Sequence, residues 1–116
     1  MTEGRSSLVF AALSSPVRRR MLDLLQQSPG LTVHALGSHF EMSPVGVLKH
    51  VRVLEESGLV HSVKKGRERR LYFNLVPIQQ IYDRWTDRYS AFWASRVVDI
   101  KHRAESRAQS KAVRRA

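Results

Sequence analysis

The chain has 116 residues, a formal net charge of +10 and no cysteine, which predicts one domain with a modest core and excludes disulfides, thiolate metal sites and thiol-based redox sensing. Its longest apolar run, residues 8–13, is too short to cross a bilayer or to serve as a signal-peptide core. We therefore expect a cytoplasmic protein without a membrane partner.

The first 30 residues carry the pattern of two helices. Residues 1–6 are expected to be flexible, and residues 8–13 to form a short helix that buries Leu8, Val9, Ala12 and Leu13. Ser15 and Pro16 predict the next helix start, because serine is a favoured N-cap and the first helical position does not use an N–H. Helical spacing then predicts a core-facing stripe of Val17, Met21, Leu24 and Leu25, ending at residues 28–30.

A helix-turn-helix is predicted next. Thr32 is the expected cap of a helix of barely two turns, with Val33, Leu36 and Phe40 facing inward. Ser43 and Pro44 predict another capped helix, which ends at Gly58 and buries Val47, Val51 and Leu54. Two short helices joined by so tight a turn are typical of a helix-turn-helix, and Gly37 permits their close packing.

The second half predicts a hairpin and a long helix. Residues 60–63 and 69–75 have the pattern of two strands that reverse at Gly66, with Leu71, Phe73 and Leu75 on one face. Pro77 predicts the start of the last helix, whose apolar residues cover more than one face. We expect some of them to contact a second copy, although a ligand pocket among the aromatic rings is an alternative. The predicted dimerisation residues are Leu8, Tyr82, Trp85, Tyr89, Phe92 and Trp93.

These elements define the predicted fold class. It is mostly α with a small β-hairpin (α+β), a winged helix-turn-helix with a long C-terminal dimerisation helix. We expect residues 1–100 to form this winged helix-turn-helix and dimerisation domain, and residues 101–116 to form a basic, flexible tail.

Positive charge is concentrated in two segments. The hairpin segment 64–70 has a net charge of +4 and the tail 101–116 has +5, whereas the rest of the chain has +1. This placement is typical of proteins that bind a polyanion through local surfaces. Arg18, Arg19 and Arg20 add a third cluster, which either contacts the DNA backbone or is a solvated helix face.

Three ordered segments resemble the ArsR family of bacterial winged helix-turn-helix transcriptional regulators. They are ALSSPVRRRMLDLL at 12–25, LKHVRVLEESGLV at 48–60 and GRERRLY at 66–72. The resemblance implies homodimers whose outer helices pair, bind a double-stranded, pseudo-palindromic operator and usually repress. Family members commonly have a polar residue where Pro44 stands and serine where Leu48 stands, so the base pairs recognised here are left open. The cysteine metal motif is absent, and the last helix is similar to the metal-independent branch.

The candidate DNA contacts fall into two groups. A helix in the major groove places its N-terminal residues nearest the base edges, and a wing contacts neighbouring phosphates. Arg67 is expected to be best placed for the minor groove. The recognition-helix candidates are Ser43, Val45, Gly46, Lys49, His50 and Arg52. The wing candidates are Lys64, Lys65, Arg67, Arg69 and Arg70.

The sequence gives weaker support to metal binding, to catalysis and to two other functions. Asp99, His102 and Glu105 are spaced three residues apart, but they do not reproduce a metal motif, so we expect no metal and no cofactor. No catalytic constellation is present, which predicts a protein that is not an enzyme. Two alternatives to a sequence-specific repressor are an architectural protein that binds DNA nonspecifically and a protein-interaction module that uses the aromatic helix.

Overall fold

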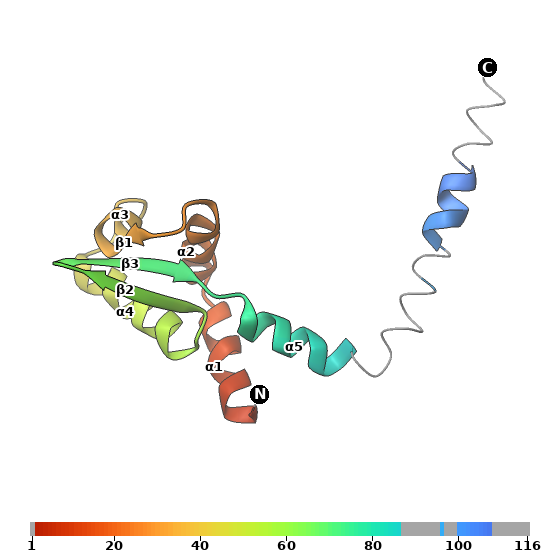
Figure 1. Ribbon diagram of the computed structural model, residues 1–116, viewed down its shortest axis with the longest axis horizontal. Coiled ribbons are helices and arrows are strands. Elements are labelled where there is room, and N and C mark those ends of the chain that lie inside the picture. Colours follow the sequence, from red (N-terminus) through yellow and green to blue (C-terminus); the bar gives the residue numbers. More distant parts are fainter. Residues whose placement is uncertain (1, 87–95, 97–99, 108–116) are drawn as a thin grey trace, which may run out of the picture. The chain divides into compact units, whose positions relative to one another are not determined.

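The computed structural model describes residues 2–86, 96 and 100–107 (Figure 1). Residues up to Ile81 form one compact unit, and the described residues from Tyr82 onward belong to a second. The elements in chain order are α1 (Glu3–Leu13), α2 (Pro16–Gln27), β1 (Leu31–Thr32), α3 (Val33–Gly37), α4 (Pro44–Glu56), β2 (Val60–Lys65), β3 (Glu68–Phe73) and α5 (Val76–Thr86). The predicted winged helix-turn-helix is confirmed.

The predicted helix starts after Ser15 and Ser43 are confirmed. The Ser15 side chain accepts a hydrogen bond from the Arg18 amide at 3.3 Å, and a proline follows the cap in both helices. The first helix differs from its prediction. It begins at Glu3 rather than at residue 8, because Thr2 accepts from the Arg5 amide at 3.3 Å and caps an additional turn.

The core lies between the helices and one face of the sheet. Its fully buried side chains come from α1, α2, α3, α4, β3 and the loop before β2, and the largest are Met21, Leu25, Leu36, Leu54, Leu59 and Leu71. Leu8, which we expected in this core, is instead 46% exposed, because α1 turns Val9 and Ala12 inward. Gly37 permits close packing of α3 on α4, since a Cβ there would lie 3.2 Å from a Val47 methyl.

The sheet has three strands in the order β1-β3-β2, all antiparallel to their neighbours. Figure 1 shows the β2–β3 hairpin extending beyond the helices as the wing. The reversal depends on Gly66, whose φ of 62° lies in the left-handed region. The strands differ from prediction: β2 continues to Lys65, and β3 ends at Phe73, so Leu75 lies beyond it and is exposed.

The last described segments are helical. α5 begins at Val76, one residue before the predicted start, and packs Ile78 and Ile81 against the core of the first unit. Residues 100–107 are helical and exposed, and the remainder of the predicted tail, 108–116, lies outside the described residues. Within the described ranges, no helix is both long enough and apolar enough to cross a membrane.

Candidate nucleic-acid interface

One face of α4 is directed away from the core. Val45, Lys49, Arg52 and Glu56 are exposed and lie on one side of the helix, because α-helices have about 3.6 residues per turn. Val47, Val51 and Leu54 occupy the opposite side and are buried. We call Val45, Lys49 and Arg52 the outward stripe. Three of the six candidates on this helix therefore have side chains exposed along its outward face.

Ser43 and Gly46 form the cap of α4. The Ser43 hydroxyl accepts a hydrogen bond from the Gly46 amide at 3.1 Å, which satisfies one of the free N–H groups of the first turn. Gly46 has no side chain with which to contact a base. These two candidates fix the helix start, and their own side chains add little polar contact surface.

His50 faces α2 rather than the outward stripe. Its Nδ1 lies 3.1 Å from Nη1 of Arg18, and the imidazole is partly buried. Burial and, second to it, the positive charge of Arg18 lower the pKa of His50. A guanidinium only donates, so Nδ1 is the acceptor and the neutral imidazole fits this contact. The structure places His50 at the junction of α2 and α4.

The arginine cluster of α2 is used within the protein. Arg18 donates to the carbonyl groups of Ala11 and Ala12, each at 2.8 Å. Arg19 donates to the carbonyl of Leu13 at 2.6 Å. Arginines that bond the last carbonyls of a helix satisfy acceptors that have no partner in the helix itself. Arg20 lies 5.7 Å from the centre of the Phe40 ring, within the range of a cation–π contact.

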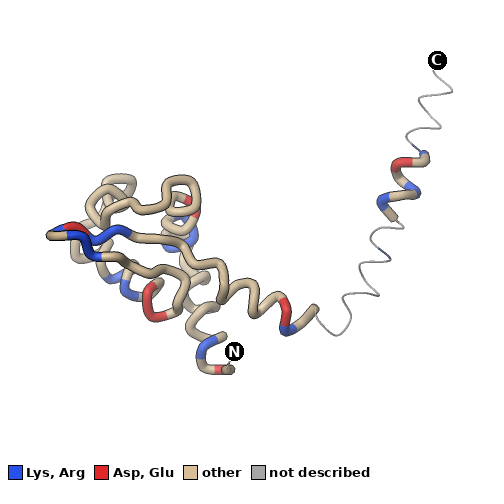
Figure 2. Tube along the Cα trace, in the orientation of Figure 1, with Lys and Arg blue, Asp and Glu red and all other residues tan. Residues whose placement is uncertain are grey.

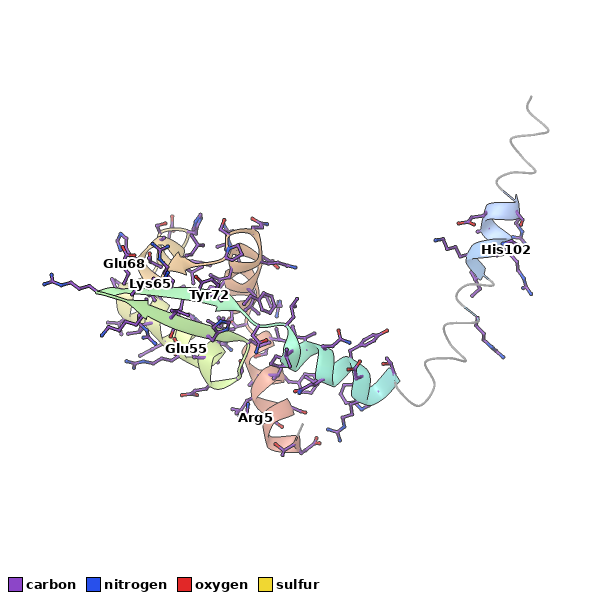
Figure 3. All side chains as sticks on the ribbon, viewed as in Figure 1. Arg5, Glu55, Lys65, Glu68, Tyr72 and His102 are labelled. Carbon is purple, nitrogen blue, oxygen red and sulfur yellow. The ribbon has the colours of Figure 1, made fainter. Side chains whose placement is uncertain are left out.

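Two of the five cationic wing candidates also bind within the chain. Nη2 of Arg69 lies 3.2 Å from both carboxylate oxygens of Glu55 and donates to the Ser62 hydroxyl. Arg70 pairs with Glu68 at 3.0 Å and donates to the Gly30 carbonyl at 3.1 Å. In Figure 3, Glu68 lies at the wing and Glu55 on α4. Arg69 therefore connects the wing to the recognition helix.

The other wing cations remain available for a ligand. Lys64, Lys65 and Arg67 are exposed around the turn, and no described acidic side chain pairs with them. Figure 2 shows their positive charge along both strands near the tip, interrupted by an acidic residue. The wing thus presents three free cations rather than the five that the sequence suggested.

A cleft separates the first turns of α4 from the wing. Pro44 and Leu48 line it on the helix side, and Arg67, Glu68 and Arg69 line it on the wing side. Leu48 is only half-buried, so part of its surface forms the wall of this cleft. Pro44 and Leu48 at the start of α4 and Arg67 of the wing therefore line one cleft.

The predicted dimerisation residues are described in part. Leu8 is 46%, Tyr82 62% and Trp85 63% exposed in the single chain, whereas Tyr89, Phe92 and Trp93 lie outside the described residues. Phe10 on α1 is also exposed and was not among the predicted residues. The sequence did offer a signal for Phe10: it is a large apolar residue on a helix whose apolar residues are not confined to one face.

Histidine and acidic side chains are dispersed over the described residues. These residues contain no group of three or more histidine, aspartate or glutamate side chains that come together. Asp99 lies outside them. Glu105 is 3.9 Å from Lys101, its partner one helical turn earlier.

Comparisons with known proteins agree with this geometry. Residues 13–63 match the helix-turn-helix domain family. The chain is 33% identical over 90 residues to the uncharacterized helix-turn-helix-type transcriptional regulator YuzN of Bacillus subtilis, covering 72% of this chain and 98% of that protein. It is 31% identical over 67 residues to the transcriptional repressor SdpR of the same organism, covering 58% of this chain and 71% of SdpR.

A solved structure extends the similarity to the fold. The ArsR-like transcriptional regulator from Rhodococcus sp. RHA1 is 34% identical, with a TM-score of 0.66 over 91% of this chain and 98% of that one. The sequence and the fold thus lead to the same group of proteins. The chain belongs to the ArsR family of helix-turn-helix transcriptional regulators, and it is a DNA-binding regulator rather than an enzyme.

Proposed function

We propose that the protein is a homodimeric repressor that binds a pseudo-palindromic operator. The observation that carries this proposal is that α4 exposes the outward stripe to solvent and the wing exposes the free cations Lys64, Lys65 and Arg67. A helix of this kind enters the major groove, and a basic hairpin next to it follows the phosphates. The similarity to the repressor SdpR supports the direction of regulation.

The dimer is supported by exposed apolar residues. Leu8, Tyr82 and Trp85 each expose about half or more of their surface in the single chain. Large exposed apolar side chains on two helices favour a protein contact over solvent. A two-fold dimer would present two copies of α4 to two half-sites about one duplex turn apart, which requires an operator with matching symmetry.

Within this proposal the candidate residues have different roles. Val45, Lys49 and Arg52 contact base edges or the nearest phosphates, and Lys64, Lys65 and Arg67 contact phosphates. His50, Arg69 and Arg70 hold α4 and the wing in position through the contacts described above. If the dimer neutralises about 6 phosphates, the logarithm of the binding constant falls with the logarithm of salt concentration with a slope of about −5.

Selection of duplexes from a random pool, followed by competition, tests this function. We expect one preferred sequence with two inverted half-sites. A large excess of random duplex of the same length should not displace this sequence from the protein. A duplex with one half-site scrambled is the matched control and should bind much more weakly. Equal competition by random duplex would contradict the proposal.

Repeating the selection with and without zinc tests the assignment to the metal-independent branch. If the assignment is right, the two selections should yield the same preferred duplex.

A second candidate is nonspecific, architectural DNA binding. It is favoured by the small number of polar side chains at the start of α4 and by the exposed basic segment 101–107. Deleting residues 103–116 separates the two candidates. An architectural protein should lose most of its affinity for any duplex, whereas a specific regulator should keep its preference for the selected sequence and lose only part of its affinity.

A further inference from the structure

The first two turns of α4 present a mainly apolar surface to solvent. Val45 is 64% exposed and Pro44 is exposed beside it, although both are apolar. Both lie at the end of the helix that enters the groove first in the proposed binding mode. An exposed β-branched side chain at this point favours an apolar group on the bound DNA.

Few polar atoms are available on the same surface. The Ser43 hydroxyl accepts a hydrogen bond from the Gly46 amide at the helix start, and His50 is turned toward Arg18. Leu48 adds an apolar wall to the cleft beside the wing. Among the described side chains of these two turns, Lys49 is the one exposed polar group of the outward stripe. Its ammonium group donates hydrogen bonds and accepts none.

The major groove offers one apolar group in ordinary DNA. This group is the C5-methyl of thymine, whereas the other base edges present hydrogen-bond donors and acceptors. A cytosine at the same place presents only C5–H where thymine has its methyl group, so the apolar contact is lost. Val45 therefore distinguishes thymine from cytosine by burying a methyl group that cytosine lacks.

We propose that Val45 packs against the C5-methyl of a thymine in each half-site, and that this contact is a main source of sequence choice. Lys49, one turn further along the outward stripe, donates to an acceptor on a neighbouring base, such as O6 or N7 of guanine or O4 of thymine. Charge complementarity supports DNA as the occupant, because Lys49 and Arg52 are exposed on the same stripe as Val45, and Lys64, Lys65 and Arg67 are exposed on the wing. The inference rests on the proposed function.

Removing single methyl groups from the DNA tests the inference. Each thymine of the selected operator is replaced in turn by deoxyuridine, which removes only the C5-methyl, and affinity is measured by fluorescence anisotropy. We expect one symmetric pair of positions at which each replacement weakens binding about fourfold, the effect of exposing about one buried methyl group. Replacing both members of the pair should weaken binding about 16-fold if the half-sites are independent.

A protein variant assigns the effect to Val45. In Val45→Ala, thymine and deoxyuridine at that position should bind equally well. Val63→Ala is the matched control, because Val63 is also an exposed valine but lies on β2, and it should keep the fourfold difference. Because both side chains are exposed, both variants should fold, which circular dichroism and thermal melting verify.

A methylated cytosine separates contact from DNA shape. The sensitive T·A pair is replaced by C·G or by 5-methylcytosine·G, and the methylated pair should bind about fourfold better to the wild type and equally to Val45→Ala. If specific binding persists and no thymine is sensitive, the inference is wrong and the proposed function stands. Sensitivity that survives in Val45→Ala would also overturn it. If the pool yields no preferred duplex, the proposed function itself fails.

Discussion

The recognition helix and the wing both appear basic in the sequence, but the structure uses their charges differently. On α4, Lys49 and Arg52 are exposed on the outward stripe, beside the apolar Val45. On the wing, Arg69 and Arg70 are paired with Glu55 and Glu68. The difference teaches that a count of cations overstates the surface available to DNA, because part of the charge holds the two regions together.

The largest expected effect comes from disrupting the proposed dimer, which removes the α4 and the wing of the second protomer. Trp85→Ala should weaken dimerisation by about 2–4 kcal/mol, because a large exposed ring on α5 is expected to become a buried contact. Operator affinity should fall with it, since one α4 and one wing are then lost together. Sedimentation equilibrium measures this effect, and a variant that remains fully dimeric would place the ring outside the interface.

Loss of a stripe cation should have the next largest effect. Arg52→Ala should weaken operator binding by about 1–3 kcal/mol if Arg52 contacts a base. Arg20→Ala is the control. Arg20 is on α2, where its guanidinium lies against the Phe40 ring, so this substitution should change binding little. Gel-shift titrations compare the variants. Similar losses in both would remove the distinction between the outward stripe and the other cationic faces.

The wing comparison predicts different salt effects for two neighbouring arginines. Arg67→Ala should reduce the magnitude of the salt slope by about 1 for each protomer, because a free cation no longer displaces a counterion from a phosphate. Arg70→Ala should change the slope less, since Arg70 is already paired with Glu68. Binding measured over a series of salt concentrations tests this order. The reverse order would show that the pair opens when DNA binds.

The junction between α2 and α4 predicts a dependence of stability on pH. The pKa of His50 is lowered by burial and by Arg18, so the unfolded chain binds a proton at a higher pH than the folded chain. The contribution of His50 is therefore complete above the ordinary histidine pKa of about 6.5 and is lost as the pH falls below it.

Denaturant unfolding at a series of pH values measures this contribution. The free energy of unfolding should decrease as the pH falls through this range in the wild type. His50→Gln keeps an acceptor for Arg18 but does not titrate, so its curve should be flatter. Identical curves for the two proteins would contradict the assigned role of His50.

The smallest expected effect comes from breaking the ion pair that joins α4 to the wing. Glu55→Gln removes the charge that holds Arg69, so unfolding should become easier by about 0.5–1 kcal/mol at most, since the pair is partly exposed. The released Arg69 should then raise the affinity for all duplexes slightly and steepen the salt slope. Thermal melting and binding titrations measure both changes. A loss of affinity would instead show that the pair positions the wing correctly for DNA.

Local signals in the sequence predicted most of the fold. Caps such as Ser15 and Ser43 act within four residues, and the buried stripe of α4 follows from helical spacing, so both are visible without any knowledge of distant contacts. Strand β1 was missed, because two residues are too few for an alternating pattern and its partners are Leu71 and Arg70 in β3.

The candidate site was predictable to a smaller extent. The bonds of Arg18 to His50 and of Arg70 to Gly30 join residues 32 and 40 positions apart, so a charge pattern along the chain cannot reveal them. The position of His50 could have been inferred. It follows buried Val47 by three residues and precedes buried Leu54 by four, which places it beside the core-facing side of α4.

The division of labour between α4 and the wing is tested most directly by one ratio, the affinity for the selected operator divided by that for random duplex at one salt concentration. We expect Lys49→Ala to lower this ratio by at least about fivefold and Arg67→Ala to leave it nearly unchanged while lowering both affinities. If Arg67→Ala lowers the ratio and Lys49→Ala does not, sequence choice belongs to the wing and the assignment of the outward stripe is wrong.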